Sequence, residues 1–361
     1  MLKINQVIYL EPQSPIYNEH YEGTIIEIAE TTFTITMPYD KGKLVLLGVG
    51  TMLRINIPGA KDWFVSEVIG RTFTPKPSLI ITIPLTLMEK RVSKKTKVIA
   101  ITSGKGGVGK TSFTINFGIT LSQMGYRTFI IDADLGTANV DVLLDLHPKY
   151  NLNHILSREK DILDIMIEGP GGVQLIPGGS GLQNLADLDE WHFNRLINSF
   201  QTLEKYADII LVDTGAGLSK NVINFVLASD EIIVVTTPEP HAITDAYAII
   251  KVMDDRDPSL RPKLVLNRVE SPEEARQISD KMIRVTERFL SIRLESLGYI
   301  LEDTNVLRAI KKLKPFVLSE PSTPAAQCVR NIAQKLLSPD LQQDYEVRKN
   351  FFHKFKELFN R

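Results

Sequence analysis

The chain has 361 residues, a formal net charge of −1 and a hydrophobic fraction of 43%. This length predicts two or three domains with a large buried core, and the near-zero charge excludes a general electrostatic attraction to nucleic acid. The single cysteine, Cys328, excludes an intrachain disulfide and a cysteine-pair metal site. No apolar run approaches the roughly 20 residues of a membrane-spanning helix, and residues 1–13 lack the apolar core of a signal peptide. We therefore expect a cytoplasmic protein.

Residues 1–85 have the pattern of a small all-β domain. Apolar and polar residues alternate in three segments, residues 32–38, 52–58 and 79–84, which turn residues separate. Short strands with this spacing predict a barrel or a sandwich. The basic segment 86–96 has no periodic face, and we expect it to be the linker to the next domain.

The rest of the chain has a different pattern of apolar residues. From Lys97 onward, apolar strands alternate with helical segments, and this alternation predicts an α/β fold whose mostly parallel sheet is covered by helices on both faces. We place this domain at residues 97–340. Residues 341–361 form a separate C-terminal segment.

Residues 104–111, GKGGVGKT, match the phosphate-binding loop GxxxxGK[ST] of P-loop NTPases. An apolar strand precedes the loop and a helix that Gly125 ends follows it, which is the context that the motif requires. Lys110 is expected on the β- and γ-phosphates of ATP, and the Thr111 hydroxyl on Mg²⁺. A glycine-rich turn without a ligand is the alternative. The residues expected to contact the nucleotide are Gly104, Lys105, Gly106, Gly107, Val108, Gly109, Lys110, Thr111, Ser112 and Asn267.

Carboxylates follow two further apolar strands. Asp132 and Asp134 come after residues 128–131, and Asp213 ends the segment DIILVD. Ligands of an open α/β sheet collect at the carboxyl ends of its strands. Asp213 has the form of a Walker B acid that holds Mg²⁺, and Asp132 is a second candidate metal ligand. Asp134 is the candidate for orienting the attacking water, with Asp132 as the alternative for this role. Helix capping or a turn is the alternative for each acid.

Asn267 lies near the end of another predicted strand, residues 263–269. Its amide can donate to and accept from the edge of a purine base. A turn residue is the alternative interpretation of Asn267.

The order of these motifs resembles the MinD/ParA ATPases over residues 97–338. The loop KGGVGKT with its leading Lys105 resembles their deviant Walker A motif, and DADLGTANVD, DTGAG, TTPEP and LNR follow in the family's order. Leu135 and Gly136 occupy positions where plasmid ParA proteins usually carry proline and glutamine. The segments DADLGTANVDVLL and DTGAG are similar to those of the FlhG group, which regulates flagellar number, and MinD is the next most similar group.

The resemblance implies a slow, partner-stimulated ATPase that dimerises with ATP. In this family the extra lysine, here Lys105, reaches across the dimer interface to the partner's nucleotide; a solvated loop charge is the alternative. Asp245 matches an acidic position at the same interface. Lys105, Lys110 and Asp134 are accordingly the candidate catalytic residues.

The C-terminal residues 349–361 predict an amphipathic helix. Its apolar side chains occupy roughly 120° of the helix, with basic residues beside them, a pattern typical of an interfacial membrane helix. The resemblance implies ATP-dependent attachment to the inner face of the cell membrane. A helix docked on the protein's own core is the alternative. The apolar arc consists of Phe351, Phe352, Phe355, Leu358 and Phe359.

Residues 1–85 resemble the domain that precedes the PilZ barrel in the flagellar brake protein YcgR. That family binds cyclic di-GMP through an RxxxR linker and a later motif; here residues 91–95 read RVSKK and the later motif is absent, so we expect no cyclic di-GMP binding. The DQAxxLR segment with which FlhG proteins activate the GTPase FlhF is also absent. An FlhF-type GTPase and flagellar switch components stay open as partners.

These features predict an ATP switch of the MinD/FlhG type that controls flagellar number or placement. Placement of the division site is an alternative with the same fold. The non-enzyme alternative is a regulatory module that binds the nucleotide without significant ATP hydrolysis. An iron–sulfur carrier is disfavoured by the lone Cys328, and no direct nucleic-acid partner is expected because the sequence has no evident basic surface.

Overall fold

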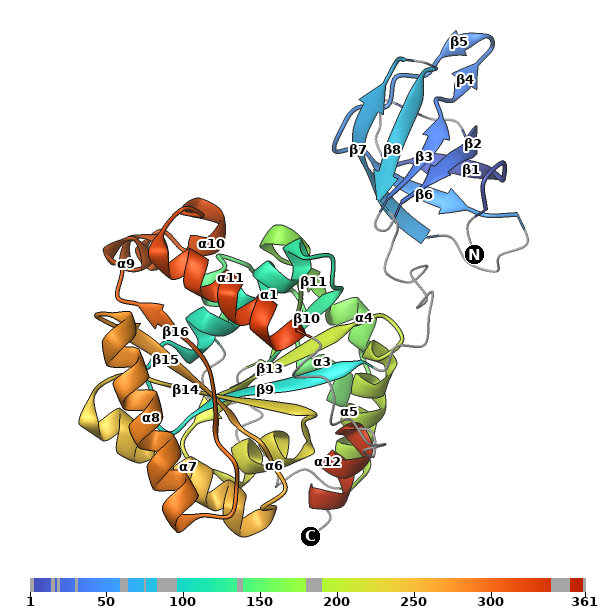
Figure 1. Cartoon of the computed structure of the whole chain (residues 1–361). Coiled ribbons are helices and arrows are strands. Elements are labelled where there is room, and N and C mark those ends of the chain that lie inside the picture. The colour runs from blue at the N-terminus through green and yellow to red at the C-terminus, as the bar shows by residue number, and fades with distance from the viewer. Residues whose placement is uncertain are drawn as a thin grey trace. The chain divides into compact units, whose positions relative to one another are not determined.

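The chain divides into two compact units, residues 1–93 and residues 94–361 (Figure 1). Of the predicted linker, residues 86–96, only Thr96 belongs to the part that the structure describes. The structure is a computed structural model that describes residues 3–13, 17, 20–29, 32–58, 64–74, 76–82, 96–134, 139–179, 190–338 and 351–359.

The first unit is a closed barrel of six antiparallel strands in the order β1-β2-β3-β8-β7-β6. Alternate side chains point inward, so that Leu53 and Ile55 of β6 are buried while Met52 and Arg54 are exposed. This confirms the barrel expected from the alternation. The strands are β1 (Val7–Pro12), β2 (Tyr21–Ile28), β3 (Thr32–Thr36), β6 (Met52–Asn56), β7 (Phe64–Thr72) and β8 (Ser78–Thr82), with a hairpin of β4 (Tyr39–Asp40) and β5 (Lys43–Leu44).

The second unit is built on an eight-stranded sheet in the order β11-β12-β10-β13-β9-β14-β15-β16. Every pair in it is parallel except β11 with β12, which confirms the predicted mostly parallel sheet. The strands are β9 (Lys97–Ser103), β10 (Thr128–Ala133), β11 (Ile167–Glu168), β12 (Gln174–Ile176), β13 (Ile209–Ala216), β14 (Glu231–Thr236), β15 (Lys263–Val269) and β16 (Glu295–Leu301).

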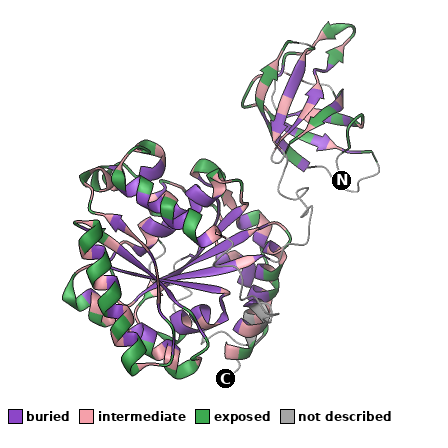
Figure 2. Cartoon of the chain, in the orientation of Figure 1, coloured by how far each residue is buried: buried purple, intermediate pink, exposed green. Residues whose placement is uncertain are grey.

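Helices cover both faces of this sheet (Figure 1). One face packs against α1 and α11, the other against α6, α7 and α8. The strands between them are buried (Figure 2), which is why they read as continuous apolar runs. The helices are α1 (Lys110–Gln123), α2 (Val140–Leu143), α3 (Leu152–Leu156), α4 (Ile162–Ile165), α5 (Glu190–Leu203), α6 (Lys220–Ala228), α7 (Pro240–Arg256), α8 (Pro272–Phe289), α9 (Thr304–Lys311), α10 (Phe316–Ser319), α11 (Pro324–Leu337) and α12 (Phe351–Phe359).

The C-terminal helix α12 is docked on α6 and α5 of its own chain. Phe351 and Phe355 are fully buried there, and the ring of Phe355 lies 4.4 Å from that of Phe225 on α6, between centroids. Of the two expected arrangements, a membrane-bound helix and a helix docked on the protein's own core, the structure contains the docked helix. The side chains of Phe352 and Phe359 lie outside the described part. Among the described helices, none is long and apolar enough to cross a membrane.

Candidate nucleotide-binding site

The phosphate-binding loop connects β9 to α1, and two of its glycines lie so close to neighbouring elements that a side chain would meet them. A Cβ on Gly104 would lie 2.1 Å from the backbone oxygen of Asp245 on α7, and one on Gly109 would lie 2.3 Å from Nδ2 of Asn267. Gly107 and Gly109 also have φ values of +80° and +88°, a conformation that costs other residues free energy. The loop therefore packs closely against α7 and β15.

Lys110 at the start of α1 lies against the predicted Walker B acid. Its Nζ is 3.0 Å from Oδ1 of Asp213, and Oγ1 of Thr114 donates to the same oxygen at 2.8 Å. Lys110 and Asp213 are 7% and 1% exposed. The other carboxylate oxygen, Oδ2 of Asp213, is buried and has no hydrogen-bond partner among the described residues.

The unpartnered oxygen of Asp213 fits a hydrated Mg²⁺ ion, because a buried acceptor without a donor is costly unless a ligand or water satisfies it. Within the described ranges, no three His, Cys, Asp or Glu side chains are gathered closely enough to hold a metal by themselves. Mg²⁺ usually keeps several waters and takes phosphate oxygens with one or two protein ligands. The unpartnered carboxylate oxygen of Asp213 fits this mode of Mg²⁺ binding.

Asp132 lies beside Asp213, with which it is paired in register across β10 and β13. Burial, and after it the negative charge of Asp213, raise the pKa of Asp132 from 3.8 to about 7, although backbone N–H groups of Asp134, Asn139 and Val140 favour the charged form. At neutral pH the Asp132 carboxyl is therefore close to half protonated in the ligand-free protein.

This raised pKa gives a pH dependence of stability. Because the native state binds the Asp132 proton more tightly than the unfolded chain does, the stabilisation is fully present below about pH 4 and is lost as the pH rises through about 7. We expect the free energy of unfolding of the wild type, minus that of Asp132→Asn, to decrease over this window. Urea unfolding of both metal-free proteins across the window measures it; a difference that stays constant would contradict the raised pKa.

Asp134, the predicted water-orienting residue, follows β10 at the same edge of the sheet. Its Oδ1 would lie 3.6 Å from a Cβ placed on Gly215 of β13, so its side chain lies over the glycine of the DTGAG motif. The three predicted acids thus converge beside the loop, as their positions after parallel strands implied.

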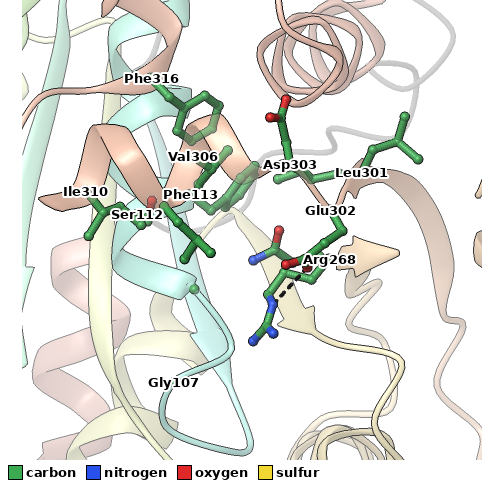
Figure 3. Close-up of a pocket in the computed structure, with 14 residues that line it drawn as sticks. Gly107, Ser112, Phe113, Arg268, Leu301, Glu302, Asp303, Val306, Ile310 and Phe316 are labelled. Carbon is green, nitrogen blue, oxygen red and sulfur yellow. Dashed lines mark hydrogen bonds and ion pairs between the residues drawn. The ribbon is translucent and has the colours of Figure 1, made fainter. Parts of the chain in front are cut away.

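A pocket lies on the other side of the loop, between the ends of β15 and β16 and the helices α9 and α10 (Figure 3). Its wall is apolar at Phe113 and Phe316 and polar at Arg268 and Glu302. Nδ2 of Asn267 donates to the backbone oxygen of Val108 at 2.8 Å, which leaves the amide oxygen of Asn267 for a ligand.

Asp303 adds a second acceptor to this pocket. Its Oδ1 accepts from the backbone N–H of Asn305 at the start of α9, whereas Oδ2 is buried without a partner among the described residues. The pocket is therefore lined by residues that carry oxygen acceptors, Asn267 and Asp303, and by the apolar side chains of Phe113 and Phe316.

Lys105 forms an exposed ion pair within its own chain. Its Nζ lies 3.6 Å from Oε2 of Glu239, and Glu239 is also 4.0 Å from Nη1 of Arg268. Arg268 in turn donates from Nε to Glu302 at 3.0 Å (Figure 3). Lys105 therefore does not share the buried position of Lys110, and a short chain of charges connects it to the rim of the pocket.

Family models match both units of the chain. A model described as an AAA domain covers residues 96–266, and one described as flagellar protein YcgR covers residues 3–84. The antiactivator FleN of Pseudomonas aeruginosa is 38% identical over 256 residues, which are 71% of this chain and 91% of FleN. The chain belongs to the MinD/ParA family of ATPases.

Further similarities fit the FleN/FlhG group of this family. The flagellum site-determining protein YlxH of Helicobacter pylori is 35% identical over 271 residues, 71% of this chain and 88% of YlxH. The MinC:MinD cell division complex of Aquifex aeolicus has a chain of the same fold, with a TM-score of 0.57 and 26% identity over 71% of this chain and 100% of that one. The YcgR match confirms the resemblance of the N-terminal barrel.

The MinD/ParA site contains residues that the sequence reasoning did not single out. Thr114, Glu239, Arg268 and Asp303 all take part in the contacts described above. Glu239 is part of the TTPEP motif. Thr114 lies one helical turn after Lys110 and therefore on the same face of α1, so the spacing of these two residues was a usable signal for Thr114. The structure places Lys110, Asp132, Asp134 and Asp213 beside one another at the loop, and it places Asn267 against Val108, whereas Lys105 pairs with Glu239 at the surface. The chemical roles of these residues stay predictions.

Proposed function

We propose that this protein is an ATP-hydrolysing switch that dimerises with ATP, attaches to the inner face of the cell membrane and regulates flagellar number or placement. The observation that carries the proposal is the buried Lys110–Asp213 pair with its unpartnered carboxylate oxygen, set at the base of a two-lysine phosphate loop. Two relatives, FleN and YlxH, carry names that describe an antiactivator and a flagellum site-determining protein.

ATP would bind with its phosphates on the loop from Gly104 to Ser112. Backbone N–H groups of the loop and of the start of α1 would donate to the phosphates, and the helix dipole there also favours anions. Lys110 would exchange the carboxylate of Asp213 for the β- and γ-phosphates. Thr111 and Asp213 would hold Mg²⁺, which neutralises phosphate charge when bound.

The pocket beside the loop suits adenine. The free amide oxygen of Asn267 and the unpartnered Oδ2 of Asp303 are acceptors, and the exocyclic amine of adenine is a donor at the base edge. Phe113 and Phe316 lie in the apolar wall of the same pocket. These groups support Asn267 as a base-binding residue.

Hydrolysis converts ATP and water into ADP and phosphate. The protein's part is mainly positioning and charge stabilisation, because phosphoryl transfer demands little else. We assign Asp134 to the attacking water, since it lies over Gly215 at the edge of the site. Lys110 and a partner's Lys105 would stabilise the charge on the transferred phosphoryl group.

Dimerisation would release Lys105 from Glu239. An exposed ion pair contributes only about 0–1 kcal/mol, whereas charge-assisted hydrogen bonds to phosphate are stronger. Lys105 can therefore leave its own chain's carboxylate for the triphosphate bound to a second subunit. Asp245, whose backbone lies against Gly104, is at the same face and is assigned to the interface.

Membrane attachment would use α12 after it leaves α6 and α5. The docked helix hides Phe351 and Phe355, so these two side chains of the apolar arc are kept from lipid in the ligand-free monomer. A dimer carries two such helices, and two linked weak sites bind far more tightly than one. Release of α12 on dimerisation would thus couple attachment to ATP, with the protein cytoplasmic otherwise.

The docked helix gives a prediction for vesicle binding. Deleting residues 349–361 is expected to abolish ATP-dependent sedimentation with anionic phospholipid vesicles, because the apolar face is lost, while dimerisation is retained. Glu357→Gln on the exposed face of α12 is the matched control and should sediment like the wild type. Unchanged sedimentation of the deletion protein would show that α12 is only a core helix.

The cellular role is tested by deleting the gene and counting flagella and minicells by electron microscopy. Extra or misplaced flagella with normal division are expected, reversed by the wild-type gene but not by Lys110→Ala. Minicells with ordinary flagella would move the protein to division-site placement. Purified protein that binds ATP without turning it over would favour the regulatory module, and pull-down from the same cells would identify an FlhF-type GTPase or a flagellar switch component as partner.

A further inference from the structure

Both carboxylate oxygens of Asp132 accept hydrogen bonds from the backbone of one segment. The N–H of Asp134 donates to Oδ1 at 3.2 Å, and the N–H groups of Asn139 and Val140 donate to Oδ2 at 3.0 and 3.1 Å. Asp132 is 1% exposed. A carboxylate has about four acceptor positions, and the chain itself fills three of them here.

The carboxylate of Asp132 has fewer free acceptor positions for a metal than that of Asp213. A Cβ on Gly178 would lie 2.4 Å from the backbone oxygen of Asp132 and 3.6 Å from its Cβ, so the chain after β12 packs against the backbone of this residue. Mg²⁺ demands oxygen ligands at about 2.0–2.1 Å in a near-ideal octahedron. The neighbouring Asp213 differs from Asp132 because its Oδ2 is buried with no partner among the described residues.

The backbone groups that Asp132 binds belong to Asp134, the proposed water-orienting residue, and to the start of α2. Asn139 is the N-cap of α2, yet its side chain makes no cap hydrogen bond. Asp132 instead accepts from the N–H of the N-cap Asn139 and from that of Val140, the first residue of α2. At the other end of the segment, it fixes the backbone of Asp134.

We infer that Asp132 is a positioning residue that holds Asp134 and the start of α2 in place, and that it is not a ligand of Mg²⁺. This inference rests on the proposed ATPase function and deepens it. Asp213 and Thr111 then remain as the protein's metal ligands. Asp132 acts on the reaction only through the geometry of Asp134.

The two roles predict different kinetics for Asp132→Ala and Asp132→Asn. Misplacing a reacting group by about 1 Å can cost roughly 100-fold in rate, so we expect turnover of Asp132→Ala to fall by about that factor. Asp132→Asn keeps one acceptor oxygen and should retain more turnover. In both variants, the Mg²⁺ concentration for half-maximal turnover should stay within about threefold of the wild type, whereas the control Asp213→Asn should raise it at least about tenfold.

Hydrogen exchange gives a readout that does not depend on turnover. In the nucleotide-free protein, the amides of Asn139 and Val140 should exchange faster in Asp132→Ala than in Asp134→Ala, which leaves their acceptor intact. A metal requirement of Asp132→Asn that rises as in Asp213→Asn, or amide exchange unchanged by Asp132→Ala, would overturn the inference. If the wild type hydrolyses no ATP, the proposed function fails, and the exchange comparison still decides the role of Asp132.

Discussion

Asp134→Ala is expected to bind ATP like the wild type and to hydrolyse it at least about 100-fold more slowly, because a positioned group that handles the reacting water contributes roughly 10²–10⁴-fold. The side chain of Asp134 lies over Gly215, whereas Lys110 pairs with Asp213, so the Asp134 variant keeps the lysine proposed to bind the phosphates. Steady-state phosphate release and equilibrium binding of a fluorescent ATP analogue measure the two quantities.

Lys110→Ala is the control for the Asp134 experiment. Loss of Lys110 also leaves Asp213 buried without its cation, and we expect this variant to lose nucleotide binding as well as turnover. Normal turnover of Asp134→Ala would assign the water to another group. Loss of ATP binding in Asp134→Ala would mean that Asp134 contacts the nucleotide or holds the loop.

Lys105→Ala is expected to weaken the ATP-bound dimer by roughly 10²- to 10⁴-fold. A hydrogen bond to a charged group contributes about 1.5–3 kcal/mol, a symmetric dimer has two such lysines, and each 1.4 kcal/mol is a factor of ten in the dissociation constant. ATP binding to the monomer should change little, because Lys105 pairs with Glu239 and stays clear of Lys110 in the single chain. Sedimentation velocity over a range of protein concentrations measures the dissociation constant.

Glu239→Gln is the matched variant for Lys105. It removes the carboxylate that pairs with Lys105 in the monomer but keeps Lys105 itself, so the dimer should be as stable as in the wild type or more stable. An Lys105→Ala protein that dimerises with ATP as the wild type does would show that this lysine is a solvated loop charge.

The local parts of this fold were predictable from sequence because their signals are local. The phosphate loop is a contiguous motif between a strand and a helix, and β9, β10 and β13 are apolar runs because helices bury both of their faces. Carboxylates directly after such strands must meet at one edge of a parallel sheet. The strands of the barrel were also predictable, because the alternation of apolar and polar residues that indicates them is a local pattern.

Contacts between distant segments were not predictable in the same way. The apolar face of α12 indicates only that some apolar surface covers it, and lipid and α6 satisfy that requirement equally well. The pairing of Lys105 with Glu239 and the orientation of Asn267 toward Val108 depend on how α7 and β15 approach the loop. The hydrogen bonds from the backbone N–H groups of Asn139 and Val140 to Asp132 join residues seven and eight positions apart, and no periodicity of the sequence encodes them.

The measurement that tests the central claim most directly is the mass of the full chain, carrying Asp134→Ala to slow hydrolysis, by light scattering with Mg²⁺ and either ADP or ATP. The account predicts a species near 40.6 kDa with ADP and a species of twice that mass with ATP. The same mass in both nucleotides would contradict a switch that works through ATP-dependent dimerisation.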